Sequence, residues 1–318
     1  MALSLRRGTV TAIAERQEGL VRCEVDGVPC VAYPRLTGPV ALGDDVLVNV
    51  QARELGLGSG GFDVLHANLT RGLELAVEPG AHVMKLPYTS LQHAVAHVEE
   101  TGHPPASLGG APVVCLTLHS QLAPVCAALA GLRITYVQLA GGALPVSLSD
   151  AVRSLGVPTV AVGACVDGDR HAVNVASALL EAVAATDVFV CGIGPGIVGT
   201  GSSFGHGAVA AAEAANAACA LDGRAILCAR VSHADARERH RGVSHHTRAA
   251  LALCLGDVTI AWPAGLEAPE WLEPREEVDV TGWEDACRGL PLSHMGRGPG
   301  QDPWFFAAAF AAGALARR

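Results

Sequence analysis

Lysine is almost absent from this sequence. The chain of 318 residues has 22 basic residues, and Lys85 is the single lysine among them, the rest being arginine. An ammonium group is compact and can lose its proton, whereas a guanidinium group stays charged. Lys85 is therefore a candidate catalytic residue, as a cation or as an amine nucleophile. Retention by chance at the surface is the alternative interpretation.

Other absences narrow the class of protein. The formal net charge is −9 and the isoelectric point is about 5.8, so no overall positive charge favours nucleic acid or an anionic membrane. No stretch approaches ~20 apolar residues, and the first residues contain no apolar run of signal-peptide length. We therefore expect neither a nucleic-acid partner nor a membrane partner.

Closely paired cysteines are also missing. The ten cysteines are scattered, mostly within apolar segments, and none belongs to a Cys-x-x-Cys pair. This pattern is typical of reduced thiols in a protein core, and not of a disulfide framework or a structural zinc site. It predicts a cytoplasmic protein.

The first 70 residues have the pattern of a small β domain. Short segments rich in β-branched residues follow one another closely, and Asp26-Gly27 between two of them is a hairpin signal. Four such strands predict a small barrel or sandwich over residues 1–70. The predicted strands are residues 8–15, 20–25, 28–34 and 46–51.

Residues 71–318 predict an α/β domain. Nearly continuous apolar strands alternate with helical segments, which is typical of a mostly parallel, doubly wound sheet with helices on both faces. The predicted strands are residues 113–118, 134–139, 159–164, 187–191, 225–231 and 258–262. The predicted helices are residues 121–130, 149–155, 172–184, 207–221 and 247–254. Residues 83–86 and 90–100 are predicted to add one further strand and helix.

The chain ends in a predicted helix, residues 304–315, that is apolar on all sides. Asp302 and Pro303 are suited to its start. Such a helix has to be buried, either within its own domain or at a subunit interface. The sequence therefore favours a homodimer formed through this helix.

A glycine-rich segment, residues 192–201, is the strongest signal of a ligand site. It follows a buried strand and precedes a helix, so it lies at the carboxyl edge of the sheet, where a helix N-terminus and exposed backbone favour an anion. Its spacing also matches the dinucleotide fingerprint, but no acidic residue ends the next strand, which leaves an NAD(P)-dependent oxidoreductase as an alternative. The predicted ligand-binding residues are Gly192, Gly194, Gly196, Gly199, Thr200 and Gly201.

An arginine- and histidine-rich segment, residues 232–247, follows the next strand. Arginines there are suited to a carboxylate or phosphate, and histidines to proton transfer near neutral pH. The predicted ligand-binding residues are Ser232, Asp235, Arg237, Arg239 and Arg241, and the predicted catalytic residues are His240 and His245. Histidines with Asp235 could also hold a metal ion. However, His245 and His246 are adjacent and should face different ways on a helix, so they form no obvious metal-binding face and no metal ligand is assigned. A solvated polar loop is the alternative.

Two further strand ends are predicted to reach the same edge of the sheet. His119 closes the strand at residues 113–118, and His206 directly precedes the helix after the glycine-rich segment; both are candidate catalytic residues. Gly141 and Gly142 close another strand and suggest a close approach of a ligand to the backbone. Packing or capping is the alternative role for each.

Five segments together carry a resemblance to one known family. They are residues 85–92, 119–124, 141–145, 192–201 and 239–247. In these segments the chain resembles the bacterial domain of unknown function 3866 family. The resemblance covers most of the chain and implies that these segments form one shared site; it implies no activity, substrate or cofactor.

Together these patterns predict an enzyme, of hydrolase or transferase type, that acts on a small metabolite bearing a phosphate or carboxylate group. No cofactor is identified by the sequence. A non-catalytic binding or scaffold protein is the remaining alternative.

Overall fold

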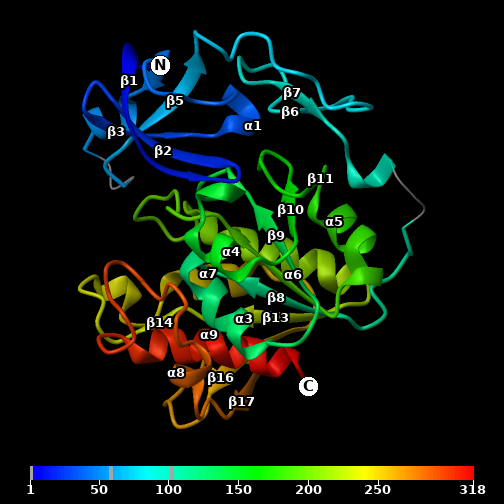
Figure 1. Ribbon diagram of the computed structural model, residues 1–318. Helices are drawn as coiled ribbons and strands as arrows, with labels where there is room; N and C mark the ends of the chain where they lie inside the picture. The colour runs from blue at the N-terminus through cyan, green and yellow to red at the C-terminus, as the bar shows by residue number, and fades with distance from the viewer. Residues whose placement is uncertain (1–2, 57–59, 101–103) are drawn as a thin grey trace. The chain divides into compact units, whose positions relative to one another are not determined.

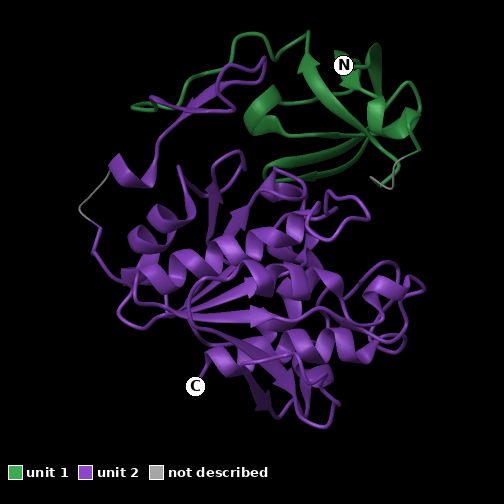
Figure 2. Cartoon of the chain, turned by 180° about the vertical axis from the view of Figure 1, so that it is seen from behind, with its two compact units in different colours: residues 1–81 green, residues 82–318 purple. Residues whose placement is uncertain are grey.

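The computed structural model describes residues 3–56, 60–100 and 104–318. The chain divides into two compact units, residues 1–81 and 82–318 (Figure 2).

The first unit is a closed β-barrel. Its strands are β1 (Leu5–Gln17), β2 (Leu20–Val25), β3 (Val28–Ala32), β4 (Asp45–Asn49) and β5 (Asp63–Asn68), in the order β1-β2-β3-β5-β4. Two short helices, α1 (Pro34–Thr37) and α2 (Gln51–Glu54), connect them. Asp26 and Gly27 have φ values of 50° and 77°, as a two-residue hairpin turn requires. The predicted barrel is confirmed, although β5 was not among the predicted strands.

The second unit is built on an eight-stranded sheet whose neighbouring strands are all parallel. The strand order is β11-β10-β9-β12-β8-β13-β16-β17. The strands are β8 (Pro112–Leu116), β9 (Ile134–Leu139), β10 (Thr159–Val162), β11 (Arg170–Ala172), β12 (Val188–Ile193), β13 (Arg224–Cys228), β16 (Val258–Pro263) and β17 (Arg275–Val278). The chain passes from β8 through β9, β10 and β11 on one side, returns to insert β12 between β9 and β8, and then adds β13, β16 and β17 on the other side. This order confirms the predicted doubly wound α/β architecture.

Helices cover both faces of this sheet (Figure 1). One face packs against α5 (Val175–Ala182), α6 (Ala210–Ala220) and α7 (His245–Leu253). The other packs against α3 (Leu122–Ala128), α4 (Asp150–Leu155) and α9 (Pro303–Ala316). The remaining helices are α8 (Trp283–Ala286) and the 3-10 turns η1 (Val98–Glu100), η2 (His119–Gln121), η3 (Val146–Leu148), η4 (Val183–Ala185), η5 (Gly207–Val209) and η6 (Glu238–His240).

Residues 83–100 were predicted as a strand and a helix, and the helix is wrong. The segment forms a two-stranded antiparallel hairpin, β6 (Val83–Lys85) and β7 (His93–Val95), followed by η1. A second small hairpin joins β14 (Val231–Ser232) to β15 (Gly242–Val243). Both segments lie outside the large sheet, so the strand–helix alternation of the rest of the unit does not extend to them.

The apolar helix α9 is buried within its own unit. It packs on α3 and the sheet, and an added Cβ at Gly313 would lie 2.3 Å from the carbonyl oxygen of Val125. A homodimer is therefore not needed to bury this helix. Asp302 stands at its start but does not cap it, because its carboxylate accepts hydrogen bonds from Ser232 Oγ and the His233 amide. Among the described residues, no helix combines the length and apolar character that a membrane crossing requires.

Candidate functional site

Glycines in the loops after β9 and β12 bring the two backbones into direct contact. A Cβ added to Gly142 would lie 2.2 Å from the carbonyl oxygen of Gly194, and one added to Gly194 would lie 2.1 Å from that of Ala143. A Cβ added to Gly207 would lie 2.0 Å from the carbonyl oxygen of Gly141. Real Cβ atoms do not approach backbone atoms so closely, so glycine is needed at each position. These glycines lie at the predicted edge, and protein backbone fills the space beside them.

The rest of the glycine-rich segment forms an exposed hairpin. Gly199 pairs with His206, and the Thr200 amide donates a 2.7 Å hydrogen bond to the Gly205 oxygen. Gly196 and Gly201 have open space beside them, whereas Gly192 is buried within β12. The dinucleotide fingerprint requires a tight turn leading directly into a helix. This hairpin separates the strand from its helix and gives the NAD(P) alternative no support.

His119 ties three elements together at the carboxyl edge. Its Nδ1 donates to the Ile193 carbonyl oxygen at 3.0 Å, and its Nε2 accepts from Ser149 Oγ at 2.7 Å. Ser149 is also the N-cap of α4. Burial lowers the His119 pKa to about 4, so the ring is neutral. With both ring nitrogens engaged, His119 positions the ends of β8 and β12.

The side chain of Lys85 reaches from β6 to the end of β10, and the residue is 2% exposed. Its Nζ donates hydrogen bonds to the carbonyl oxygens of Ala161, at 3.0 Å, and Gly163, at 2.8 Å. Burial lowers its pKa to about 8. Two strands separate β10 from β8. Within the described residues, no hydrogen bond joins Lys85 to the predicted catalytic histidines of the later loops, which are His206, His240 and His245.

Because the Lys85 amine is buried, we expect the free energy of unfolding to rise at alkaline pH. The Lys85 pKa is about 8 in the folded chain and has its ordinary value of 10.5 in the unfolded chain, so between these values the unfolded chain binds more protons. The free energy of unfolding therefore rises with pH across this window. We expect urea denaturation at several pH values to show a weaker rise for Lys85→Met than for the wild type. Identical pH slopes in the two proteins would contradict the assigned environment of Lys85.

Four histidines come together between the loops after β12 and β13. His206 precedes η5, His240 ends η6, and His245 and His246 form the first turn of α7. The ring centroid of His206 lies 5.0 Å from that of His245 and 4.1 Å from that of His246, and the His240 ring lies 4.8 Å from each of the same two rings. We call these four residues the histidine cluster. Three of its members were predicted site residues.

The expectation that His245 and His246 face different ways is wrong. Their ring centroids are 4.5 Å apart, because η5 packs against this end of α7 and both rings turn toward His206. His206, His245 and His246 each offer one ring nitrogen, and these three atoms lie within 4.8 Å of one another. These residues have the donor set of a transition-metal site.

A buried arginine, Arg230, supports the cluster and was not predicted. It is 2% exposed; its guanidinium donates to His246 Nδ1 at 3.0 Å and pairs with Asp235 at 3.3 Å. Arg230 follows the apolar end of β13. A charged residue at that position in the sequence could have indicated a buried ion pair or a site residue. His294 was also missed: its ring stacks on Phe305, with centroids 3.8 Å apart.

The predicted polar segment divides into a buried part and an exposed part. Asp235 is buried and pairs with Arg237 at 2.9 Å and with Arg297 at 3.3 Å, and its amide donates a hydrogen bond to Ser232 Oγ. These contacts make Ser232, Asp235 and Arg237 structural links of the loop. Arg239 and Arg241 are exposed.

The environment keeps the imidazoles of the cluster uncharged. Burial, and then the charge of Arg230, lowers the pKa of His240 to about 3 and that of His246 to about 2. For His245, burial, then His206 and then Arg239 lower the pKa to about 4. At neutral pH each of these rings therefore has one nitrogen with a lone pair, which can accept a proton or bind a metal ion where no hydrogen bond occupies it. In His246 that lone pair accepts the hydrogen bond from Arg230.

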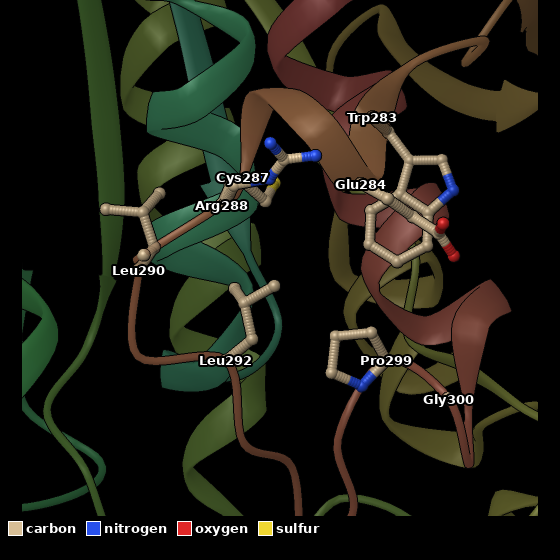
Figure 3. A pocket seen from close by; sticks show the side chains of 9 residues that line it. Trp283, Glu284, Cys287, Arg288, Leu290, Leu292, Pro299 and Gly300 are labelled. Carbon is tan, nitrogen blue, oxygen red and sulfur yellow. The ribbon is translucent and has the colours of Figure 1, made fainter.

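A surface pocket of about 480 Å³ lies elsewhere in the second unit (Figure 3). Trp283, Glu284 and Arg288 of the α8 region line it, together with Leu292 and Pro299. Trp283 also stacks on Phe306, with ring centroids 6.3 Å apart. None of the predicted site residues lines this pocket.

The comparison with known families gives one match. The family model described as protein of unknown function (DUF3866) matches residues 29–313 of the 318. No curated protein matches the chain. The matched range includes the histidine cluster and the glycine loops.

Proposed function

This chain belongs to the family described as protein of unknown function (DUF3866), and, since that description names no activity, we propose from the site that it binds a small anionic metabolite. The ligand carries a phosphate or carboxylate group, and the chain acts on it as a hydrolase or transferase. The proposed ligand residues are the exposed arginines beside the histidine cluster.

One observation carries this proposal: Arg239 is an exposed guanidinium beside the cluster, and among the described residues it has no carboxylate partner. Arg239 directly precedes His240 in η6, so it adjoins the histidine cluster along the chain. Within the described ranges, no hydrogen bond or ion pair engages the Arg239 side chain. A guanidinium in this state is suited to bind a carboxylate or phosphate in a bidentate manner.

The local charge supports an anion. The segment and its neighbours contribute Arg230, Arg237, Arg239, Arg241 and Arg297, against three carboxylates, Asp235, Glu238 and Asp302. The whole chain has a net charge of −9, so this excess of positive charge is local. Such a local excess of positive charge attracts an anion.

Hydrolysis or group transfer fits these residues better than hydride transfer does. Unprotonated imidazoles adjoin the proposed anion site, where they can accept a proton or hold a metal ion. The glycine loops, by contrast, are occupied by backbone contacts between the segments after β9 and β12. We also propose a cytoplasmic location, because all ten cysteines are free and mostly buried.

A binding experiment tests the anion site. We expect phosphate, pyrophosphate or citrate to raise the melting temperature of EDTA-treated protein in a concentration-dependent manner. Arg239→Met should weaken binding by roughly 10–100-fold, the cost of losing a charge-assisted hydrogen-bond pair. Arg35→Met, in the barrel, is the matched control and should bind like the wild type. Equal affinities for wild type and Arg239→Met, or no response to any of these anions, would refute the proposal.

A further inference from the structure

Two chain segments that are distant in sequence present imidazole nitrogens to one another. His206 stands at the end of the exposed hairpin and directly precedes η5, while His245 and His246 begin α7. The packing of η5 against α7 brings the three residues together. One ring nitrogen of each lies within 4.8 Å of the other two.

His206 is oriented as metal-binding histidines are. Its Nε2 donates a 3.0 Å hydrogen bond to the carbonyl oxygen of Ser203, so the proton is on Nε2 and Nδ1 carries the lone pair. The residue is 6% exposed, and its Nδ1 is a buried atom without a hydrogen-bond partner among the described residues. A hydrogen bond from the outer nitrogen to a backbone carbonyl is the usual way in which a protein fixes a metal-ligating imidazole.

His245 provides a second ring nitrogen that is buried and without a described partner. Its Nε2 is buried and, within the described part of the chain, also has no hydrogen-bond partner. His206 Nδ1 and His245 Nε2 are thus two buried polar atoms without a described partner, on rings whose centroids lie 5.0 Å apart. Buried polar atoms ordinarily have a hydrogen-bond partner or bind an ion or a water molecule. A divalent transition-metal ion with an affinity for imidazole would satisfy both atoms at once.

We infer that His206, His245 and His246 hold a divalent transition-metal ion, with Zn²⁺ the ion that this donor set suits best. Three imidazoles leave a fourth tetrahedral position open, which is the arrangement of catalytic and not of structural zinc sites. A water molecule or an anionic oxygen is the chemistry suited to that position. This inference is independent of the anion proposal, because either can fail while the other holds.

Arg230 sets a condition on the third ligand. A guanidinium only donates, so its 3.0 Å bond to His246 Nδ1 places the proton of that ring on Nε2. Metal binding to His246 therefore requires the ring to give up this bond, whichever nitrogen coordinates. Arg230 then keeps its ion pair with Asp235. The His246 ring can therefore either accept the hydrogen bond from Arg230 or bind the metal ion, but not both at once.

Calorimetric titration of the full chain with ZnCl₂ tests the inference. The protein is stripped with EDTA and dialysed into a metal-free buffer without phosphate or carboxylate, so that the result does not depend on anion binding. We expect one zinc ion per chain. His206→Gln retains a donor for Ser203 but replaces the imidazole nitrogen with an amide group, which is a poor zinc ligand. It should weaken binding by more than the roughly 10–100-fold that loss of an outer-shell partner costs. His245→Ala and His246→Ala should do the same, and His233→Ala, an exposed neighbour, should bind like the wild type.

A second measurement uses only the wild-type chain, so it holds even if a variant fails to fold. Cobalt(II) should give the visible absorption of a four-coordinate site without the sulfur charge-transfer band that a cysteine ligand would add. With ¹⁵N-labelled histidine, zinc should shift the ring resonances of three of the 13 histidines. No zinc binding, a sulfur band, or unchanged affinity in His206→Gln and His245→Ala would overturn the inference.

Discussion

Replacement of Gly207 by alanine is expected to destabilise the second unit by about 3 kcal/mol or more, the upper range for overpacking a filled site. The added Cβ would lie 2.0 Å from the Gly141 carbonyl oxygen and 2.6 Å from the Gly141 Cα. Both are backbone atoms, so the clash can be relieved only if the loop after β9 separates from the start of η5. That movement would also displace His206, which is adjacent in sequence.

The measurement is urea denaturation followed by tryptophan fluorescence. All four tryptophans, Trp262, Trp271, Trp283 and Trp304, belong to the second unit, so the signal reports on that unit alone. Gly201→Ala is the matched control, because no described atom lies within 4 Å of its added Cβ. Its stability should change by less than about 0.5 kcal/mol. Equal effects of the two substitutions would contradict the close approach of the loops.

Replacement of Arg230 by methionine is expected to destabilise the same unit by about 3 kcal/mol. Arg230 and Asp235 each have 2% of their side chain exposed, and loss of one partner from a buried ion pair leaves the other charge poorly compensated. The cost falls at the lower end of the usual range of about 3–5 kcal/mol, because Asp235 keeps Arg237 and Arg297. His246 Nδ1 also loses its donor.

Arg288→Met provides the comparison, measured by the same fluorescence-detected denaturation. The Arg288 side chain is 80% exposed and pairs with a similarly exposed Asp285, so its removal should change stability by less than about 1 kcal/mol. If Arg230→Met were as stable as the wild type, the desolvation of Arg230 would fully offset its contacts. Arg230 would then be retained for a role other than stability.

Much of the fold followed from local patterns. The apolar strands of the second unit bury both faces, and the helices between them could be placed within a few residues, as with α4 at Asp150–Leu155 after β9 at Ile134–Leu139. The segment after Lys85 could not be predicted, because its hairpin lies outside the repeating units and has no strong periodicity. The place of α9 was also open, since a helix apolar on all sides indicates burial but not the surface that buries it.

The sequence by itself determined where polar and glycine residues gather, because parallel strands bring their carboxyl ends to one edge of a sheet. Only the tertiary structure decided what those residues do there. Gly142 and Gly194 serve the contact between two loops, which depends on the neighbour that each loop meets in space. His245 and His246 converge on His206 because η5 packs against α7, and spacing along one helix carries no information about a second segment. The parallel arrangement of the strands therefore determines the edge of the sheet at which these residues lie. The packing between the loops determines which of them come into contact there.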